Sequence, residues 1–151
     1  MAAGMDFVAA TNNQHKLEEI RRILEAMGHR VVSLGQLGLN IDPEETGTTF
    51  AQHAALKALE VCKAAGLPAV ADDSGLVVDA LAGAPGVYTA RCVDLGGPPE
   101  DWEFTYPNLS SHEAANIAKL LRLMQGVPTE KRTARFVSAV ALVMPNGAVL
   151  Q

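Results

Sequence analysis

The chain has little of several features that would place it in a class at once. It contains two cysteines in 151 residues, Cys62 and Cys92, with no Cys-x-x-Cys spacing. The sequence therefore predicts free thiols in a reducing cytoplasm rather than a disulfide framework. No apolar run approaches the length needed to cross a membrane. The N-terminal residues lack a basic start and an apolar core, so no signal peptide is expected.

Positive charge is also scarce. Lys and Arg number 12 against 17 Asp and Glu, which gives a formal net charge of −5. This balance argues against a broad binding surface for duplex nucleic acid, although it leaves room for a local phosphate pocket. Because 48% of the residues are hydrophobic, the chain can bury the core of one domain. Its 151 residues are too few for two domains. We expect residues 1–151 to form a single domain that binds neither nucleic acid nor membrane.

Short apolar runs alternate with segments of helical periodicity, which predicts an α/β fold with a mixed, twisted sheet flanked by helices. The expected strands are residues 7–10, 30–34, 69–71, 76–81 and 133–144. The expected helices are one that ends at Gly28, one from Thr48 or Thr49 to Gly66, and one from Ser110 or Ser111 through Met124. Pro145-Asn146-Gly147 predicts a hairpin turn, and the sequence stops soon after it. We therefore expect the domain to be incomplete at its C-terminus.

A polar segment follows the first strand and enters the first helix. It consists of Thr11, Asn12, Asn13, Gln14, His15 and Lys16. Backbone N–H groups at a helix start, together with the Lys16 ammonium, suit a bound phosphate. The segment lacks the glycine spacing of a Walker loop, and an asparagine before a helix is also a plain N-cap. Both interpretations stay open, and His15 is expected on the surface.

Two adjacent acids, Asp72 and Asp73, follow the apolar run at 69–71, with Ser74 directly after them. Such an order is typical of a strand that delivers acids to the edge of a sheet, where α/β folds bind ligands. Carboxylates suit Mg²⁺ that bridges protein acids to substrate phosphates, and one carboxylate could deprotonate a water. The alternative is a turn in which the two acids accept backbone N–H groups. Lys57, on the second helix, either reaches a phosphate or covers surface.

Four motifs occur in a fixed order along the chain. They are Thr11 to Ile20, Glu45 to Phe50 followed by Lys57, Ala71 to Leu76, and Gly83 to Arg91. On these motifs the chain resembles the inosine triphosphate pyrophosphatases, which act on non-standard purine nucleoside triphosphates. The resemblance covers about residues 7–136. It implies a cytoplasmic, homodimeric, Mg²⁺-dependent hydrolase that converts ITP, dITP and XTP to the monophosphate and pyrophosphate.

The resemblance also implies roles for individual residues. The segment from Thr11 to Lys16 would cradle the triphosphate, Asp73 would bind metal and accept a proton, and Ser74 would contact substrate. These roles agree with the chemistry, because hydrolysis of a phosphate anhydride needs an activated water and neutralised charge.

The chain departs from the family pattern in two places. Gln52-His53-Ala54 stands where the family has Glu-Asn-Ala, whose glutamate helps to bind metal. The amide oxygen of Gln52 is a candidate ligand without the charge of a carboxylate, so weaker metal binding is expected, and His53 is expected on the helix surface. The family's later Gly-Phe-Gly-Tyr-Asp-Pro and Ser-His-Arg motifs do not occur in this sequence. The alternative function is a non-catalytic truncated relative that acts as a nucleotide-binding or protein-interaction module.

Overall fold

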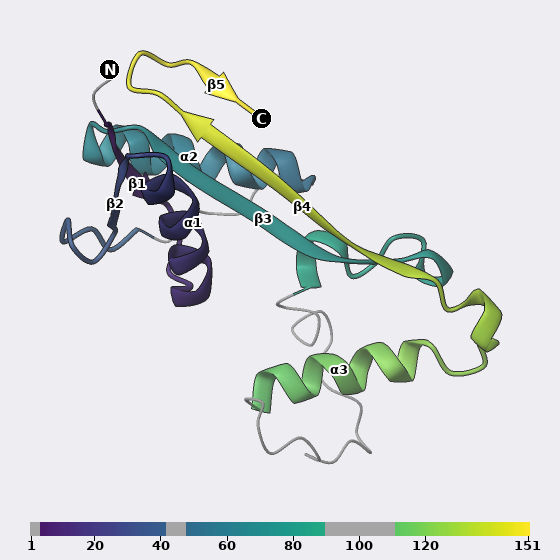
Figure 1. Ribbon diagram of the computed structural model, residues 1–151. Helices are drawn as coiled ribbons and strands as arrows, with labels where there is room; N and C mark the ends of the chain where they lie inside the picture. Colours follow the sequence, from purple (N-terminus) through teal and green to yellow (C-terminus); the bar gives the residue numbers. More distant parts are fainter. Residues whose placement is uncertain (1–3, 42–47, 90–110) are drawn as a thin grey trace. The chain divides into compact units, whose positions relative to one another are not determined.

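The computed structural model describes residues 4–41, 48–89 and 111–151 (Figure 1). The chain divides into two compact units, Met1–Asp73 with Ser138–Gln151, and Ser74–Val137. The helices are α1 (Gln14–Ala26), α2 (Phe50–Ala65) and α3 (Ser111–Leu123), with short 3₁₀ helices η1 (Asp79–Leu81) and η3 (Thr129–Lys131). The strands are β1 (Asp6–Ala9), β2 (Arg30–Ser33), β3 (Ala69–Val78), β4 (Ala134–Val143) and β5 (Val149–Leu150).

The strands form one mixed sheet in the order β2-β1-β3-β4-β5. β1 runs parallel to β2 and to β3, with Val8 opposite Val32 on one side and opposite Ala69 on the other. β5 returns antiparallel to β4, with Val149 opposite Val143. The predicted α/β class, the mixed sheet and the hairpin are therefore confirmed.

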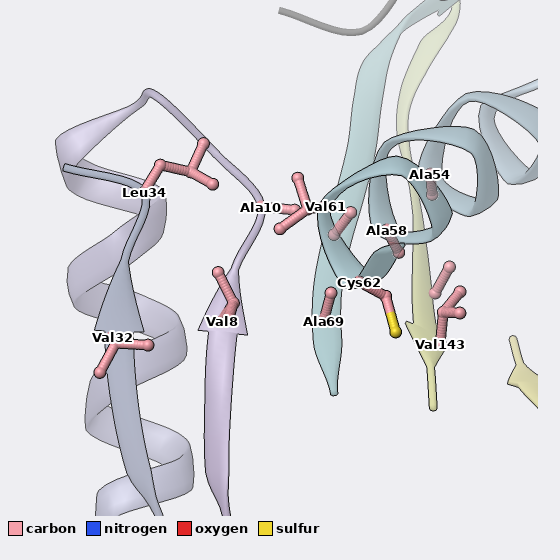
Figure 2. Packing of buried hydrophobic residues seen from close by; sticks show 12 residues of the cluster. Val8, Ala10, Val32, Leu34, Ala54, Ala58, Val61, Cys62, Ala69 and Val143 are labelled. Atoms are coloured by element: carbon pink, nitrogen blue, oxygen red, sulfur yellow. The ribbon is translucent and has the colours of Figure 1, made fainter. Parts of the chain in front are cut away.

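Helices α1 and α2 cover opposite faces of the parallel strands. Adjacent residues of a strand point to opposite faces. Val8 lies in a buried cluster with Val61 of α2, whereas Ala9 lies in a second cluster with Leu17 of α1. All the labelled side chains of Figure 2 belong to the cluster on the α2 side, among them Val8 and Val32 on the strands and Ala54, Ala58 and Cys62 on the helix.

The helix ends follow from capping residues, as predicted. Thr49 caps α2, since its side chain accepts from the backbone of Gln52 while the Gln52 side chain accepts from the backbone of Thr49. Gly66 ends α2 in the left-handed region at φ 68°, a conformation that favours glycine. Within the described ranges no helix is long and apolar enough to span a bilayer.

One strand prediction was wrong. Residues 69–71 and 76–81 were expected as two strands, but β3 is continuous over Ala69–Val78 and residues 79–81 form η1. The acids interrupt the apolar pattern without ending the strand. Their carboxylates are neutralised by lysines, Asp72 by Lys16 and Asp73 by Lys57. An acidic pair with such partners is tolerated in extended structure, which the isolated pattern does not reveal.

Truncation of Val61 tests the α2 side of the core. Val61 is almost fully buried, so Val61→Ala should lower the free energy of unfolding by roughly 2 kcal/mol, because it removes two buried methyl groups and leaves a cavity. Denaturant titration measures the loss. The same change at Val140, which is more than half exposed on β4, should lower the free energy of unfolding clearly less. Equal losses would contradict the packing described for α2.

Candidate functional site

The candidate site lies where the pairing between β1 and β3 ends. Their parallel pairing ends at Ala9 opposite Val70, and the backbone N–H of Ala10 donates to the carbonyl of Val70 at 2.8 Å. Beyond this point β3 carries Asp72 and Asp73, while the chain after β1 turns into α1. Both carboxylates therefore lie beyond the carboxyl end of β1, the place where open α/β sheets bind ligands.

The turn between β1 and α1 is built by its own polar side chains. Asn13 Oδ1 accepts from the backbone N–H groups of His15 at 2.9 Å and Lys16 at 3.3 Å. The Asn13 N–H donates to Thr11 Oγ1 at 3.0 Å, and Asn12 Nδ2 donates to the Ile41 carbonyl at 3.4 Å. The N-cap interpretation of Asn13 is confirmed. The predicted phosphate role is untested, although the side chains of Asn12, Gln14 and His15 are exposed.

Lys16 connects this turn to the first acid. Its Nζ lies 3.2 Å from Asp72 Oδ2, and the two side chains are 29% and 19% exposed. The other oxygen, Asp72 Oδ1, is buried and accepts no hydrogen bond from the part of the chain that the structure describes. A buried carboxylate oxygen of this kind is an available acceptor or metal ligand.

Two side chains of α2 meet the second acid. Asp73 is buried, with Lys57 Nζ 3.6 Å from its Oδ1 and His53 Nδ1 3.2 Å from its Oδ2. His53 and Lys57 stand four residues apart, which puts them on one face of the helix. The predicted site residues thus form two pairs within one unit, Asp72 with Lys16 on the α1 face of β3 and Asp73 with Lys57 on the α2 face.

The surface position expected for His53 was wrong, because its side chain is 1% exposed. Ala54, Ala58 and Cys62 form one buried stripe of α2, but the buried face is wider and also contains His53 and Val61. The spacing of His53, Lys57 and Val61, four residues apart each time, was the signal that this face continues.

The Gln52 side chain caps the start of α2. Its Oε1 accepts from the Thr48 N–H at 2.8 Å, the Thr48 hydroxyl at 3.2 Å and the Thr49 N–H at 3.3 Å. These donors complete the cap of α2. The prediction that Gln52 binds metal is untested, and a cation would have to compete with these donors for the same oxygen.

The donor set fits a hard divalent cation that is shared with a ligand. Among the described residues, no group of three or more His, Cys, Asp or Glu side chains is placed to hold a metal. Mg²⁺ is often bound by one or two carboxylates together with substrate phosphates, rather than by a protein cage. Asp72, with its buried unbonded Oδ1, faces α1, and Asp73 faces α2, so each carboxylate is a separate candidate ligand on its own face of β3.

The other residues that the sequence analysis named are treated in turn. Ser74 is exposed and begins the second unit. Glu45, Arg91 and Cys92 lie outside the described residues.

The fold and the site define an α/β protein in which paired carboxylates and lysines lie at the carboxyl ends of parallel strands, beside a helix N-terminus. Such a site suits phosphorylated ligands. The profile of the Ham1 family matches residues 7–151, and the chain belongs to this family.

Named relatives and solved structures agree with the family. The chain is 46% identical over 145 residues to a dITP/XTP pyrophosphatase of Desulforamulus reducens, covering 96% of this chain and 65% of the relative. It is 47% identical over 148 residues to that of Bifidobacterium longum, covering 94% and 53%. A nucleoside-triphosphatase / dITP/XTP pyrophosphatase structure from Mycobacterium abscessus matches with TM-score 0.74 and 40% identity, covering 97% of this chain and 69% of that one. A HAM1 protein from Coxiella burnetii matches with TM-score 0.78 and 33% identity, covering 97% and 68%.

The chain spans 65% and 53% of the lengths of these two curated relatives. Their activity is therefore a proposal for this chain.

Proposed function

We propose that this chain hydrolyses the non-standard purine nucleoside triphosphates dITP, ITP and XTP to the monophosphate and pyrophosphate. The observation that carries the proposal is the buried Asp73 with the Lys57 ammonium 3.6 Å away, next to the Asp72–Lys16 pair at the start of α1. The printed names of the relatives, dITP/XTP pyrophosphatase, support the substrate class.

In the proposed reaction, water attacks a phosphorus atom and the anhydride bond between the α- and β-phosphates breaks. A new bond forms between phosphorus and the water oxygen, and the bridging oxygen leaves with the other fragment. Asp73 accepts the proton of the water, because its carboxylate is held beside the place of reaction. Lys16 and Lys57 neutralise the charge that develops on the phosphate oxygens. The exposed turn from Thr11 to Lys16 holds the triphosphate, and Ser74 contacts substrate.

The proposed cofactor is Mg²⁺, which Asp73 on the α2 face of β3 would hold together with the triphosphate. Asp72, which pairs with Lys16 on the α1 face, is a second candidate ligand. When bound, Mg²⁺ would supply charge neutralisation at the phosphates and lower the pKa of a water. Carboxylate ligands favour this hard cation over softer metals.

The test is pyrophosphate release from dITP, XTP, dGTP and ATP in the presence of Mg²⁺ or Mn²⁺. We expect release from dITP and XTP well above that from dGTP and ATP. Equal rates with all four would keep the hydrolase and reject the purine selectivity. No release of pyrophosphate from any of them by folded protein would reject the proposed function.

Gln52→Glu is expected to raise metal affinity by about five- to tenfold, because a full negative charge close to a bound dication is worth on the order of 1 kcal/mol even in water. The carboxylate can still complete the cap of α2. Titration with Mn²⁺ measures the affinity. Gln52→Ala, which removes the cap without adding charge, is the matched control and should cost stability without raising affinity. An unchanged affinity in Gln52→Glu would show that position 52 does not face the cation.

A second candidate is a nucleotide-binding or protein-interaction module without catalysis. It is favoured by Gln52, whose amide oxygen is occupied by the cap of α2 instead of offering a charged ligand. Binding of dITP with no turnover at any concentration of Mg²⁺ or Mn²⁺ would support this candidate.

Two further features belong to the proposal. A homodimer is supported by the exposed apolar side chains of Val140 on β4 and of Val149 and Leu150 on β5, which belong to one unit and which an interface would cover. Light scattering measures this state. A cytoplasmic location is supported by Cys62, a buried free thiol.

A further inference from the structure

The edge of β3 that faces β1 is paired over only part of its length. β1 has 4 residues and β3 has 10, and their parallel pairing stops at Ala9 opposite Val70. The last hydrogen bond of this ladder runs from the Ala10 N–H to the Val70 carbonyl at 2.8 Å. After it the chain turns into α1, so β1 leaves the next part of this edge uncovered.

The first backbone donor on the uncovered edge is the N–H of Asp72. The backbone groups of alternate residues in a strand face the same neighbouring strand, so Asp72 follows Val70 on the β1 side. A continued ladder would join the Asp72 N–H to the Ala10 carbonyl. Ala10 lies outside β1, however, and the Asp72 N–H has no hydrogen-bond partner among the described residues. A backbone N–H without a partner in the chain is satisfied by water or by a ligand, so this N–H is an available donor.

The turn from β1 into α1 uses several of its own backbone donors. Asn13 Oδ1 accepts from the N–H groups of His15 at 2.9 Å and Lys16 at 3.3 Å, and the Asn13 N–H donates to Thr11 Oγ1 at 3.0 Å. These are donors that a helix start would otherwise offer to an anion. An anion held at this turn therefore gains from a donor on a neighbouring element, and the open edge of β3 supplies one.

The carboxylates on either side of this edge are each paired with a lysine. Lys16 Nζ lies 3.2 Å from Asp72 Oδ2, and Lys57 Nζ lies 3.6 Å from Asp73 Oδ1. All four side chains belong to the same unit as β1 and α1. Because each ammonium offsets the charge of one carboxylate, an anion can approach the Asp72 N–H against less repulsion than two unpaired acids would exert.

We propose that the backbone N–H of Asp72 binds substrate by donating a hydrogen bond to a phosphate oxygen of the triphosphate. This inference rests on the proposed function and gives Asp72 a binding group besides its carboxylate. The strand holds the N–H in place before the substrate arrives, so the donor can stabilise charge on the phosphate without reorganisation.

Hydrogen exchange followed by amide NMR tests this donor directly, with inorganic tripolyphosphate and Mg²⁺ as the probe. In the free chain, the Asp72 N–H should exchange much faster than the Ala10 N–H, which is bonded in the ladder. Saturating tripolyphosphate should slow exchange at Asp72 by about tenfold or more and move its proton resonance downfield, while exchange at Ala10 stays unchanged. Equal protection of the two N–H groups in the free chain, no change at Asp72 on saturation, or no binding of tripolyphosphate would each overturn the inference.

The variants Asp72→Pro and Asp72→Ala separate the N–H from the carboxylate. Both lack the carboxylate, but only Asp72→Ala keeps the N–H. Proline is tolerated at a sheet edge where no ladder bond is lost, so the two variants should unfold at similar denaturant concentrations. We expect Asp72→Pro to bind tripolyphosphate about tenfold or more weakly than Asp72→Ala, because a hydrogen bond to a charged group is lost. Equal affinities of the two folded variants would contradict the proposed donor.

An ester bond between Ala71 and Asp72 removes the same N–H and keeps the Asp72 side chain, and it decides the question if Asp72→Pro does not fold. Cys62 and Cys92 allow a synthetic segment 62–91 to be ligated to the rest of the chain. The control is an all-amide chain assembled in the same way. Against it, the ester chain should show kcat/KM for dITP and affinity for tripolyphosphate lowered by about 10- to 100-fold. Unchanged values in the folded ester chain would overturn the inference.

The outcomes for this N–H and for the proposed function are separable. If the chain binds tripolyphosphate at the Asp72 N–H but releases no pyrophosphate from dITP, the proposed hydrolysis fails and the N–H remains a phosphate-binding group. If the chain releases pyrophosphate while the ester chain keeps the kcat/KM of the control, the hydrolysis stands and the role of the Asp72 N–H is rejected.

Discussion

Asp73→Asn is expected to lower kcat for dITP hydrolysis by about 10³-fold or more. An amide cannot accept the proton of water, and general base catalysis contributes roughly 10²- to 10⁴-fold. The amide also removes the negative charge that faces Lys57 at 3.6 Å and that would hold a cation. Pyrophosphate release at saturating dITP and Mg²⁺ measures the loss, with circular dichroism as the check that the variant is folded.

The matched control is Asp79→Asn. Asp79 lies on η1, its side chain is 52% exposed, and it pairs with Arg135 at 3.3 Å. Asp79→Asn makes the same chemical change at a half-exposed side chain that accepts hydrogen bonds from Thr133 and Arg135. We expect kcat to stay within about twofold of the parent, because surface changes seldom matter beyond a few tenths of a kcal/mol. Comparable losses in the two variants would remove Asp73 from its proposed role.

Lys57→Met should lower kcat/KM for dITP by about 100-fold. The change keeps most of the aliphatic length and removes the cation next to Asp73, so charge on the phosphate oxygens loses a preorganised partner, an effect that typically costs about 10²- to 10³-fold. Steady-state kinetics over a range of dITP concentrations measures it. The result also decides between the two interpretations of Lys57 that the sequence left open.

Lys63→Met is the control on the same helix. Lys63 is exposed in the last turn of α2, where it complements the helix dipole. We expect a small loss of stability and unchanged kinetics. If Lys57→Met also kept its kcat/KM within about threefold, Lys57 would only cover surface. Lys16 alone would then neutralise the charge on the phosphate oxygens.

The sequence predicted the local architecture well where capping and periodicity act together. Thr49 and Gly66 bracket α2 as expected, and Gly28 lies beyond the end of α1. Capping residues lie next to the helix ends that they stabilise, so the sequence alone can predict them. The candidate acids Asp72 and Asp73 were also found from sequence, because charged residues after a buried apolar run have few structural explanations.

The rest depended on contacts between distant residues. His53 was expected on the helix surface, whereas its ring is buried beside Asp73, twenty positions along the chain. The capping hydrogen bonds of Gln52 likewise depend on where α2 begins, which the sequence predicted only to within one residue. Side-chain pairing of this kind is decided by packing, which a pattern of polar and apolar residues does not specify.

The most direct test of the account is the product ratio from dITP with Mg²⁺. Each turnover should yield one dIMP and one pyrophosphate, with no inorganic phosphate, and folded Asp73→Asn should yield both products about 10³-fold more slowly. Release of inorganic phosphate and dIDP instead, or equal yields from the parent and Asp73→Asn, would contradict a pyrophosphatase built on this carboxylate.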